Sequence, residues 1–338
     1  MAIASGTVTL ADYALMSNSP LVRAVTYSLI LYSNIIQDVP LASKKSLIIN
    51  GARFEGNLPT VNWSQLNAEG VTTRGTPTAY QEQAYIIRNY IDVDKFLVEE
   101  ENAIVDPRSV QSEAYLKALT YDMNYKFLKN DHVTGDVNAP VGIRYRIDNG
   151  GTFGVRPENK VNGGGLDLSQ ATLGTTSSNG NKFIEFLDQL LWSVDSPEGE
   201  GVVLYMNEVM KRRFTFALRN LGTAGGFEIT RDMFNRTVTM YKGAVLRDPG
   251  YKADQSTRII TTTELSDGSA DTGSTYTSIY AVNYSTDHFS GWQFQPPNVQ
   301  DLGLIYNGAI YRTLIDWAVG FNNASTRSIG RLYGLKLS

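Results

Sequence analysis

The sequence contains no cysteine and only two histidines, His132 and His288. The absence of cysteine excludes disulfide frameworks, cysteine nucleophiles and thiolate metal sites, and it is typical of a chain made in a reducing compartment. The two histidines are far apart in the sequence and each lies in a predicted loop, so neither belongs to a cluster suited to zinc binding or general-base chemistry. We therefore expect neither a metal nor a cofactor.

The net charge is small, and long apolar runs are few. The 338 residues include 30 Lys and Arg against 34 Asp and Glu, a formal net charge of −4. This balance argues against a function that depends on neutralising nucleic acid phosphates. The apolar stretch at 25–36 is too short, and with Thr26, Ser28 and Asn34 too polar, to span a bilayer. No membrane partner is expected.

Motifs for the common catalytic sites are missing as well. No phosphate-binding G-x-x-x-x-G-K-[ST] loop occurs, and the glycines at 150–154 do not match a dinucleotide fingerprint. Ser328 lacks the first glycine of a nucleophile elbow, because Thr326 stands in its place. A glycosidase-type pair of carboxylates stays open, since spacing along a sequence does not report separation in space. The chain is not expected to be an enzyme.

The sequence does contain enough apolar residues for a sizeable core. Hydrophobic residues make up 42%, with 30 glycines and 19 tyrosines, a composition that suits strands and long turns. Residues 133–181 are interpreted as turns and loops with a short strand at 142–147. Helices are predicted at 183–191 and 208–221, and strands at 202–206, 237–241, 244–246, 278–284, 316–321 and 329–337. The predicted class is mixed α+β.

The clearest helix begins at Asp106-Pro107 and is predicted to end near Lys129. At ~1.5 Å per residue it would be roughly 35 Å long. Its apolar residues form one stripe with a second beside it, and we expect them to face a core. The first stripe is Ala114, Ala118, Tyr121, Tyr125 and Leu128, and the second is Tyr115, Leu119, Met123 and Phe127.

An N-terminal arm is predicted to contain another helix, which Ser19 caps and Pro20 opens, and which ends near Val39-Pro40. The first 45 residues hold too few apolar groups for a core of their own. We therefore expect the arm to pack on a neighbouring subunit as well as on its own. Its apolar stripe consists of Leu21, Val25, Leu29, Tyr32 and Ile36.

A long hairpin is predicted over residues 45–98, with β-like halves at 53–66 and 78–98. Such a hairpin has little to bury by itself. We therefore expect it to reach a neighbouring subunit.

The tip of this hairpin, residues 68–77, is polar and rich in turn formers, which predicts a mobile segment. Glu69 and Arg74 are the candidate polar contacts that the tip would make with a neighbour.

Basic residues gather on the helix predicted at 208–221, where Lys211, Arg212 and Arg219 stand. The chain as a whole is acidic and shows no aromatic platform for single strands. We interpret this face as solvated or as a subunit contact, without sequence-specific recognition of DNA.

The order of these parts resembles the major capsid protein of tailed bacteriophages, which has the Hong Kong 97 fold. That fold comprises an N-terminal arm, an extended E-loop, a long spine helix in the P-domain, an A-domain and a return of the chain to the P-domain. Nearly the whole chain can be laid on that order. Short stretches are also similar to the family, at 10–14, 20–23, 38–41, 203–207, 241–246 and 331–335.

The resemblance implies a subunit that assembles with copies of itself into the pentamers and hexamers of an icosahedral virion capsid. Assembly would take place in the host cytoplasm, and the shell would enclose double-stranded DNA without sequence specificity. A portal and separate scaffolding or decoration proteins would be further partners. The implied domains are the arm at 1–44, the E-loop at 45–100, the P-domain at 101–140 and 302–338, and the A-domain at 141–301.

Two other readings of the sequence remain. The first is another phage structural subunit, such as a tail-tube or decoration protein, which would also self-assemble or coat a particle. The second is an enzyme that uses a pair of carboxylates.

Overall fold

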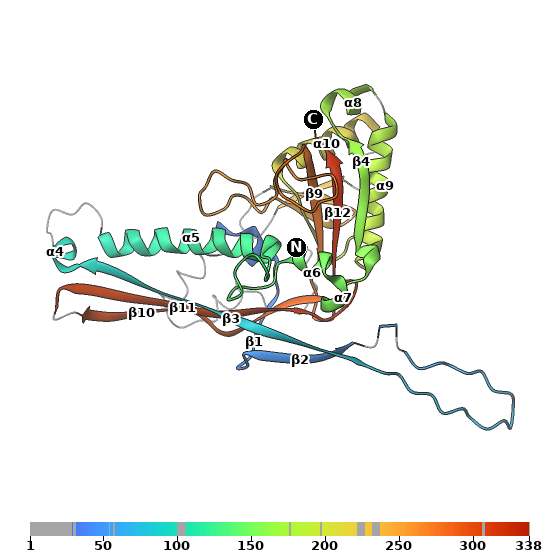
Figure 1. The fold of residues 1–338 in the computed structure, drawn as a ribbon, viewed down its shortest axis with the longest axis horizontal. Helices are drawn as coiled ribbons and strands as arrows, with labels where there is room; N and C mark the ends of the chain where they lie inside the picture. The colour runs from blue at the N-terminus through green and yellow to red at the C-terminus, as the bar shows by residue number, and fades with distance from the viewer. Residues whose placement is uncertain are drawn as a thin grey trace.

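The computed structural model describes residues 29, 32–53, 55–56, 58–99, 106–175, 177–196, 198–221, 227–231, 237–305 and 308–337. These residues form two β-sheets with helices packed against them (Figure 1). One sheet is long and runs beside helix α5 (Pro107–Lys129), and the other belongs to a lobe that rises at one end of it. The fold is mixed α+β, as the sequence predicted.

The long sheet has five strands in the order β1-β10-β11-β3-β2. Strand β11 pairs antiparallel with β10 on one side and with β3 on the other, whereas β1 pairs with β10 in parallel. Segments from both ends of the chain therefore share one sheet. The strands are β1 (Leu41–Ser43), β2 (Ile48–Arg53), β3 (Thr78–Asp94), β10 (Phe289–Ile305) and β11 (Ile310–Asn323), and the short helix α4 (Lys95–Val98) follows β3.

Helix α5 occupies the predicted range. The Asp106 carboxylate accepts a hydrogen bond from the backbone N–H of Arg108, which caps the first turn. The prediction that the stripe containing Ala114 and Ala118 faces the core was wrong in part, because these two residues are exposed whereas Leu128 of the same stripe is buried. Neighbouring stripes differ by a rotation of about 100°, and periodicity does not say which one meets the sheet. The buried residues are Leu116, Leu119, Thr120, Met123, Asn124, Phe127, Leu128 and Lys129.

An aromatic cluster around Phe127 of α5 joins the two sheets. The Phe127 ring meets Phe321 of β11 and Phe289 of β10 edge to face, with ring centroids 4.9 and 5.8 Å apart. On another side it meets Tyr205, from β5 (Val202–Tyr205) of the lobe, at 6.4 Å. Phe127 therefore contacts both the long sheet and the lobe.

The lobe contains a seven-stranded sheet in the order β4-β12-β9-β5-β8-β7-β6. Helices α9 (Ser177–Ser193) and α10 (Glu208–Leu221) pack together through Phe183 and Phe214, whose ring centroids are 6.2 Å apart. The strands predicted in this region are confirmed to within two residues. They are β5, β7 (Thr237–Tyr241), β8 (Ala244–Arg247), β9 (Tyr276–Asn283) and β12 (Ile329–Lys336). The sheet also contains β4 (Lys160–Asp167) and β6 (Phe227–Arg231), which were not predicted as strands.

The prediction of turns and loops over 133–181 was wrong in part. Residues 142–147 do not form a strand, because α6 (Ile143–Asp148) covers them. Strand β4 contains the Asn-Gly-Gly-Gly run and pairs in parallel with β12 from the end of the chain, a partner that local composition does not reveal. The remaining short helices are α7 (Gly150–Phe153), η1 (Pro157–Asn159) and α8 (Gln170–Thr175).

The hairpin predicted at 45–98 is shorter in strand structure than expected. Strand β2 ends at Arg53, and no strand occurs among the described residues between 55 and 77. Strand β3 pairs with β2 only through Gln83, and from Ala84 onward it pairs with β11. The strand predicted at 53–66 was wrong beyond Arg53, because Arg53 already pairs with Thr78, the first residue of β3.

A buried ionic cluster holds the end of α5 against the lobe. The Lys129 ammonium lies 2.8 Å from Glu264 and 2.7 Å from Asp271. Arg331 of β12 lies 3.4 Å from the other carboxylate oxygen of Glu264. Burial by itself lowers the pKa of Lys129, but Tyr280 and the two carboxylates raise that pKa overall, so this lysine stays charged.

Among the described helices, none combines the length and the apolar character needed to cross a membrane.

Candidate assembly surfaces

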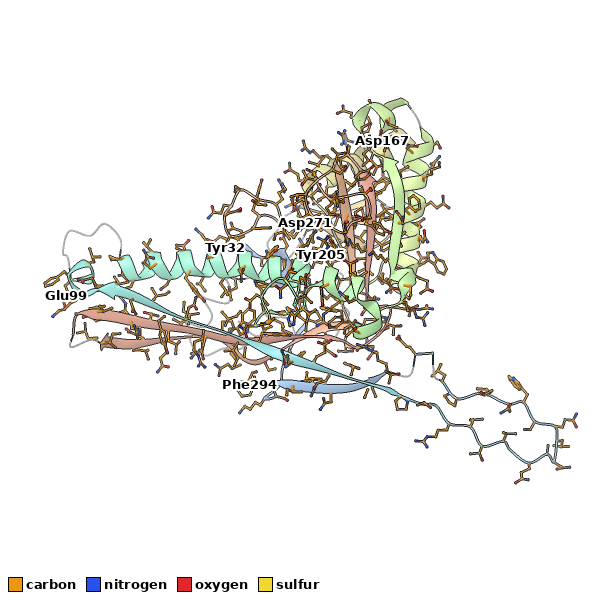
Figure 2. All side chains as sticks on the ribbon, in the orientation of Figure 1. Tyr32, Glu99, Asp167, Tyr205, Asp271 and Phe294 are labelled. Carbon is orange, nitrogen blue, oxygen red and sulfur yellow. The ribbon has the colours of Figure 1, made fainter. Side chains whose placement is uncertain are left out.

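Residues 55–56 and 58–77, between β2 and β3, form a segment that we call the projecting loop. It extends away from both sheets (Figure 1), and beyond its root the side chains stand clear of the rest of the subunit (Figure 2). Nearly all of these residues are exposed, and Trp63 is 98% exposed. Apolar side chains gathered on an extended segment indicate contact with another molecule. The large apolar residues of the loop are Leu58, Val61, Trp63, Leu66 and Val71.

Both charged residues predicted at the tip, Glu69 and Arg74, lie in the projecting loop and are exposed. Neither takes part in a hydrogen bond or an ion pair with the described part of the chain. The sequence did not single out the five apolar residues as contacts, because it placed most of them in a strand.

The arm lies against the core of its own subunit. Leu29 and Ile36 are both buried in the cluster that includes α5 and the long sheet. The Tyr32 hydroxyl donates a hydrogen bond to the Glu113 carboxylate of α5 at 3.1 Å, and the Lys117 ammonium lies 5.1 Å from the Tyr32 ring centroid. The described part of the arm therefore does have a local core to enter.

The prediction of one unbroken helix in the arm was wrong at Ser33. The backbone of Ser33 is extended (φ −120°, ψ 119°), and its side chain accepts from the Ile36 N–H to cap α3 (Asn34–Asp38). Serine competes with the helical backbone in this way, which favours a cap over a helix interior. Leu21 and Val25, the first two residues of the predicted stripe, lie outside the described residues.

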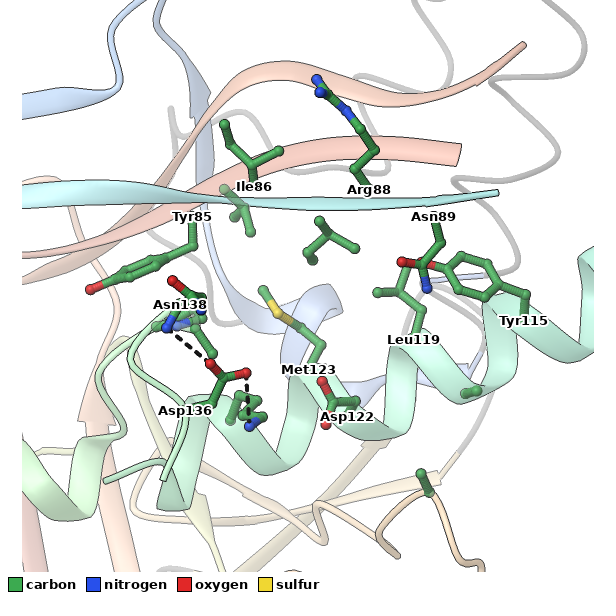
Figure 3. A pocket seen from close by; sticks show the side chains of 17 residues that line it. Tyr85, Ile86, Arg88, Asn89, Tyr115, Leu119, Asp122, Met123, Asp136 and Asn138 are labelled. Carbon is green, nitrogen blue, oxygen red and sulfur yellow. Dashed lines mark hydrogen bonds and ion pairs between the residues drawn. The ribbon is translucent and has the colours of Figure 1, made fainter. Parts of the chain in front are cut away.

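A groove of about 470 Å³ lies between α5 and β3 (Figure 3). The carboxylate of Asp136 pairs with the Lys126 ammonium at 3.4 Å, and burial raises the pKa of Asp122. Carboxylates disfavour a phosphate ligand, whereas the apolar walls suit a protein segment. Sequence reasoning missed this groove because its two walls are far apart in the chain. The lining includes Tyr85, Ile87, Tyr115, Leu119 and Met123.

The basic residues of α10 do not form one continuous cationic face. Arg212 and Arg219 are exposed and seven positions apart, so they share one side of the helix. Lys211 is turned about 100° away and is partly buried, and this burial lowers its pKa. Two exposed arginines provide weak, non-specific attraction to phosphates and no reading of bases.

The two histidines lie in separate places, and the groups nearest to them are few. Nδ1 of His288 lies 3.0 Å from Ser285 Oγ, and its Nε2 lies 3.9 Å from the Asp195 carboxylate. Ser285 Oγ also accepts the backbone N–H of His288, which is a turn interaction, and 3.9 Å exceeds hydrogen-bond reach. Nε2 of His132 lies 2.7 Å from the Ala139 carbonyl oxygen. Within the described ranges, no group of three or more metal-ligating side chains could hold an ion.

Comparison with known proteins yields no match to a family model and none to a curated sequence, but solved structures are similar over nearly the whole chain. The holo-SrpI encapsulin complex from Synechococcus elongatus has a TM-score of 0.57 at 12% identity, over 96% of this chain and 94% of that one. The capsid of an empty GTA particle has a TM-score of 0.53 at 11% identity, over 90% of each chain. The capsid of Myoviridae phage XM1 has a TM-score of 0.52 at 10% identity, over 87% of this chain and 90% of that one.

At these identities the similarity shows the fold alone, which is the fold of capsid-forming proteins. More particularly, the chain has the Hong Kong 97 capsid fold, as its order of parts suggested.

Proposed function

We propose that this chain is a major capsid protein, whose copies assemble into the pentamers and hexamers of an icosahedral bacteriophage head around double-stranded DNA. The observation that carries the proposal is the projecting loop, with five large apolar residues exposed on a subunit whose sheets and helices otherwise pack closely. In a fold shared with phage capsids, a segment of this kind fits contact with a second copy of the chain.

Assembly would be distributed over many weak contacts. A contact of ~4 kcal/mol corresponds to a dissociation constant of about 1 mM, yet several such contacts acting together hold a closed shell. Trp63 could supply one of them. An aromatic side chain buries about 150–250 Å², which at about 25 cal/mol per Å² is a gross gain of ~4–6 kcal/mol. Part of this gain offsets the freedom that the subunits lose on association.

We assign residues 1–44 to the arm, 45–100 to the E-loop, 101–140 and 302–338 to the P-domain, and 141–301 to the A-domain. Strand β10 spans the boundary between residues 301 and 302, so the A-domain and the P-domain share this strand.

The proposed contacts divide into direct and indirect ones. Glu69 and Arg74 would pair with a neighbour directly, since both are exposed. Leu29 and Ile36 are buried in their own subunit and would act indirectly, by anchoring the arm. Tyr32, bonded to α5, would set the direction in which the arm leaves the body. We propose that Leu21 and Val25 continue this stripe toward a neighbour.

The partners we propose are further copies of the chain, a portal, separate scaffolding or decoration proteins, and packaged DNA. A net charge of −4 suits a shell that DNA enters under force, because an interior that gripped phosphates would hinder both packing and release.

Electron microscopy of the purified protein tests this proposal. We expect closed shells with pentamers and hexamers, and in shells taken from infected cells we expect nuclease-protected double-stranded DNA. Tubes would favour a tail-tube subunit, and monodisperse globular particles would overturn self-assembly.

A second candidate is a shell that encloses protein, because an encapsulin complex is among the similar structures, with a TM-score of 0.57 over 96% of this chain. Shells that copurify with a stoichiometric protein and without DNA would favour this candidate.

A further inference from the structure

The projecting loop is fastened to the body at its root. Arg53, the last residue of β2, is 8% exposed. Its guanidinium donates to the carbonyl oxygens of Phe153 at 3.1 Å and Ala324 at 3.3 Å, and also to that of Asn323. The same guanidinium lies over the Tyr80 ring, 4.1 Å from its centroid. The side chain of Arg53 is therefore held on several sides within its own subunit.

Glu55, two residues further along, holds the same part of the body. One carboxylate oxygen accepts from Ser325 Oγ at 2.5 Å, and the other accepts from the Thr326 backbone N–H at 2.6 Å. Burial by itself raises the pKa of Glu55, but these hydrogen bonds outweigh burial, and the pKa lies below its ordinary value. The carboxylate is therefore charged near neutral pH. Hydrogen bonds to a charged acceptor, one on each oxygen, define the direction of the side chain.

The turn that Arg53 and Glu55 hold is the connection between the two sheets. Strand β11 of the long sheet ends at Asn323, and β12 of the lobe begins at Ile329. The Ser328 hydroxyl donates to the side-chain oxygen of Asn323, which closes the turn. The root of the projecting loop is therefore bonded to the segment through which the chain passes from one sheet to the other.

The Arg53 guanidinium lies directly against Gly154, where the absence of a side chain leaves room for it. Gly154 has φ +66°, and a Cβ atom there would lie 2.0 Å from Nη1 of Arg53. A side chain at position 154 would displace the guanidinium and strain the backbone. A third segment of the chain, around Gly154, therefore also accommodates the Arg53 side chain.

We propose that Arg53 and Glu55 are positioning residues, which fix the direction of the projecting loop relative to the lobe by fastening its root to turn 324–328. The inference deepens the proposed function, on which it rests for the loop's role in meeting a second copy. A loop held in one direction at its root loses less conformational freedom on assembly than a loop that swings, even where its tip is mobile.

Spin labels can test this cleanly, because the chain has no cysteine of its own. Thr60→Cys places one label on the loop just beyond the root, and Glu185→Cys places the other on the exposed side of α9. Double electron–electron resonance then measures the distance distribution between the labels in free, full-length subunits. We expect a narrow distribution for the parent pair and at least a twofold broadening for Glu55→Ala. Glu69→Ala removes a carboxylate of the same loop that has no partner in the described part of the chain, and it should leave the width unchanged.

Two further variants separate positioning from a general effect on folding. Glu55→Gln keeps one acceptor oxygen and should broaden the distribution to an intermediate extent. Ser325→Ala removes the donor on the turn and should also broaden it. The double variant Glu55→Ala with Ser325→Ala should be no broader than Glu55→Ala alone, because both changes break the same link.

An unchanged width in a Glu55→Ala subunit that melts like the parent would overturn the inference. So would equal broadening by the Glu69→Ala control, or additive broadening in the double variant. If Glu55→Ala does not fold, Glu55→Gln and Ser325→Ala decide in the same way. The measurement uses free subunits, so a failure of the parent chain to form shells would count against the proposed function and leave this result standing.

Discussion

Replacing Lys129 with methionine tests the ionic cluster that holds α5 against the lobe. The side chains of Lys129 and Glu264 are both 1% exposed, and their charged atoms are 2.8 Å apart. Lys129→Met keeps an unbranched apolar stem but leaves the buried Glu264 carboxylate without this cation. Breaking one side of a buried pair costs about 3–5 kcal/mol. Arg331 still faces Glu264 at 3.4 Å, so we expect the lower end of that range.

The assay is denaturant unfolding of free subunits, followed by circular dichroism. Lys117→Met is the matched control on the same helix, since its partner Glu113 is an exposed group 3.1 Å away. Exposed pairs contribute about 0–1 kcal/mol. Lys129→Met with Glu264→Gln should recover part of the loss, because the unpaired buried charge is gone. A loss for Lys129→Met no larger than that for Lys117→Met would refute the reasoning.

Asp271 makes the stability that this cluster provides depend on pH. Burial alone raises the pKa of Asp271, but Lys129 and Arg144 hold it below its ordinary value of 3.8. A carboxyl group whose pKa is lowered by folding contributes stability above its unfolded pKa and loses it as the pH falls through the folded pKa. Parent subunits should therefore lose stability as the pH falls below 3.8, and Lys129→Met should lose less over the same interval.

The remaining predictions concern assembly and DNA. Deleting residues 1–28 keeps the buried Leu29 and Ile36, so it should leave a soluble subunit that forms no closed shells in electron micrographs; normal shells would contradict the role of the arm. Arg74→Glu should lower the yield of shells while leaving the melting temperature of free subunits nearly unchanged. A clear drop in that melting temperature would indicate that Arg74 acts in folding instead. Amide hydrogen exchange at 68–77 should be fast in free subunits and slow in shells, and equal protection in both forms would show that the tip is not an assembly element. Binding to duplex DNA should be weak, salt-sensitive and indifferent to sequence, with a lower salt slope after Arg212→Glu; tight binding to one sequence at physiological salt would count against this.

Local signals were sufficient where a segment forms its own hydrogen bonds. Helix α5 was predicted at both ends, because Asp106 and Pro107 mark its start and the apolar period continues to Lys129. Strands β5, β7, β8, β9 and β12 were predicted for a different reason. Several of them pair with distant strands, but each is a short apolar run between turn formers, which is a signal in its own sequence. The fold class followed from these elements together.

Local signals failed where a distant segment supplies the partner. Strand β4 is rich in glycine and becomes a strand only because β12 pairs with it. The extent of strand in the predicted hairpin was overestimated because the β2–β3 pairing ends at Arg53 and Thr78, and the described residues from 55 to 77 form no strand. The choice between the two stripes of α5 likewise depended on the direction from which the long sheet approaches.

By itself, the sequence determined the order of the elements, the absence of thiol chemistry, and an exposed polar tip with Glu69 and Arg74. Only the tertiary structure decided that this tip stands on an apolar segment fastened at Arg53 and Glu55 to the turn between the sheets. The physical reason is that those bonds join residues about 270 positions apart, and a pattern of side chains along a sequence carries information only about neighbours within a few turns or strand residues.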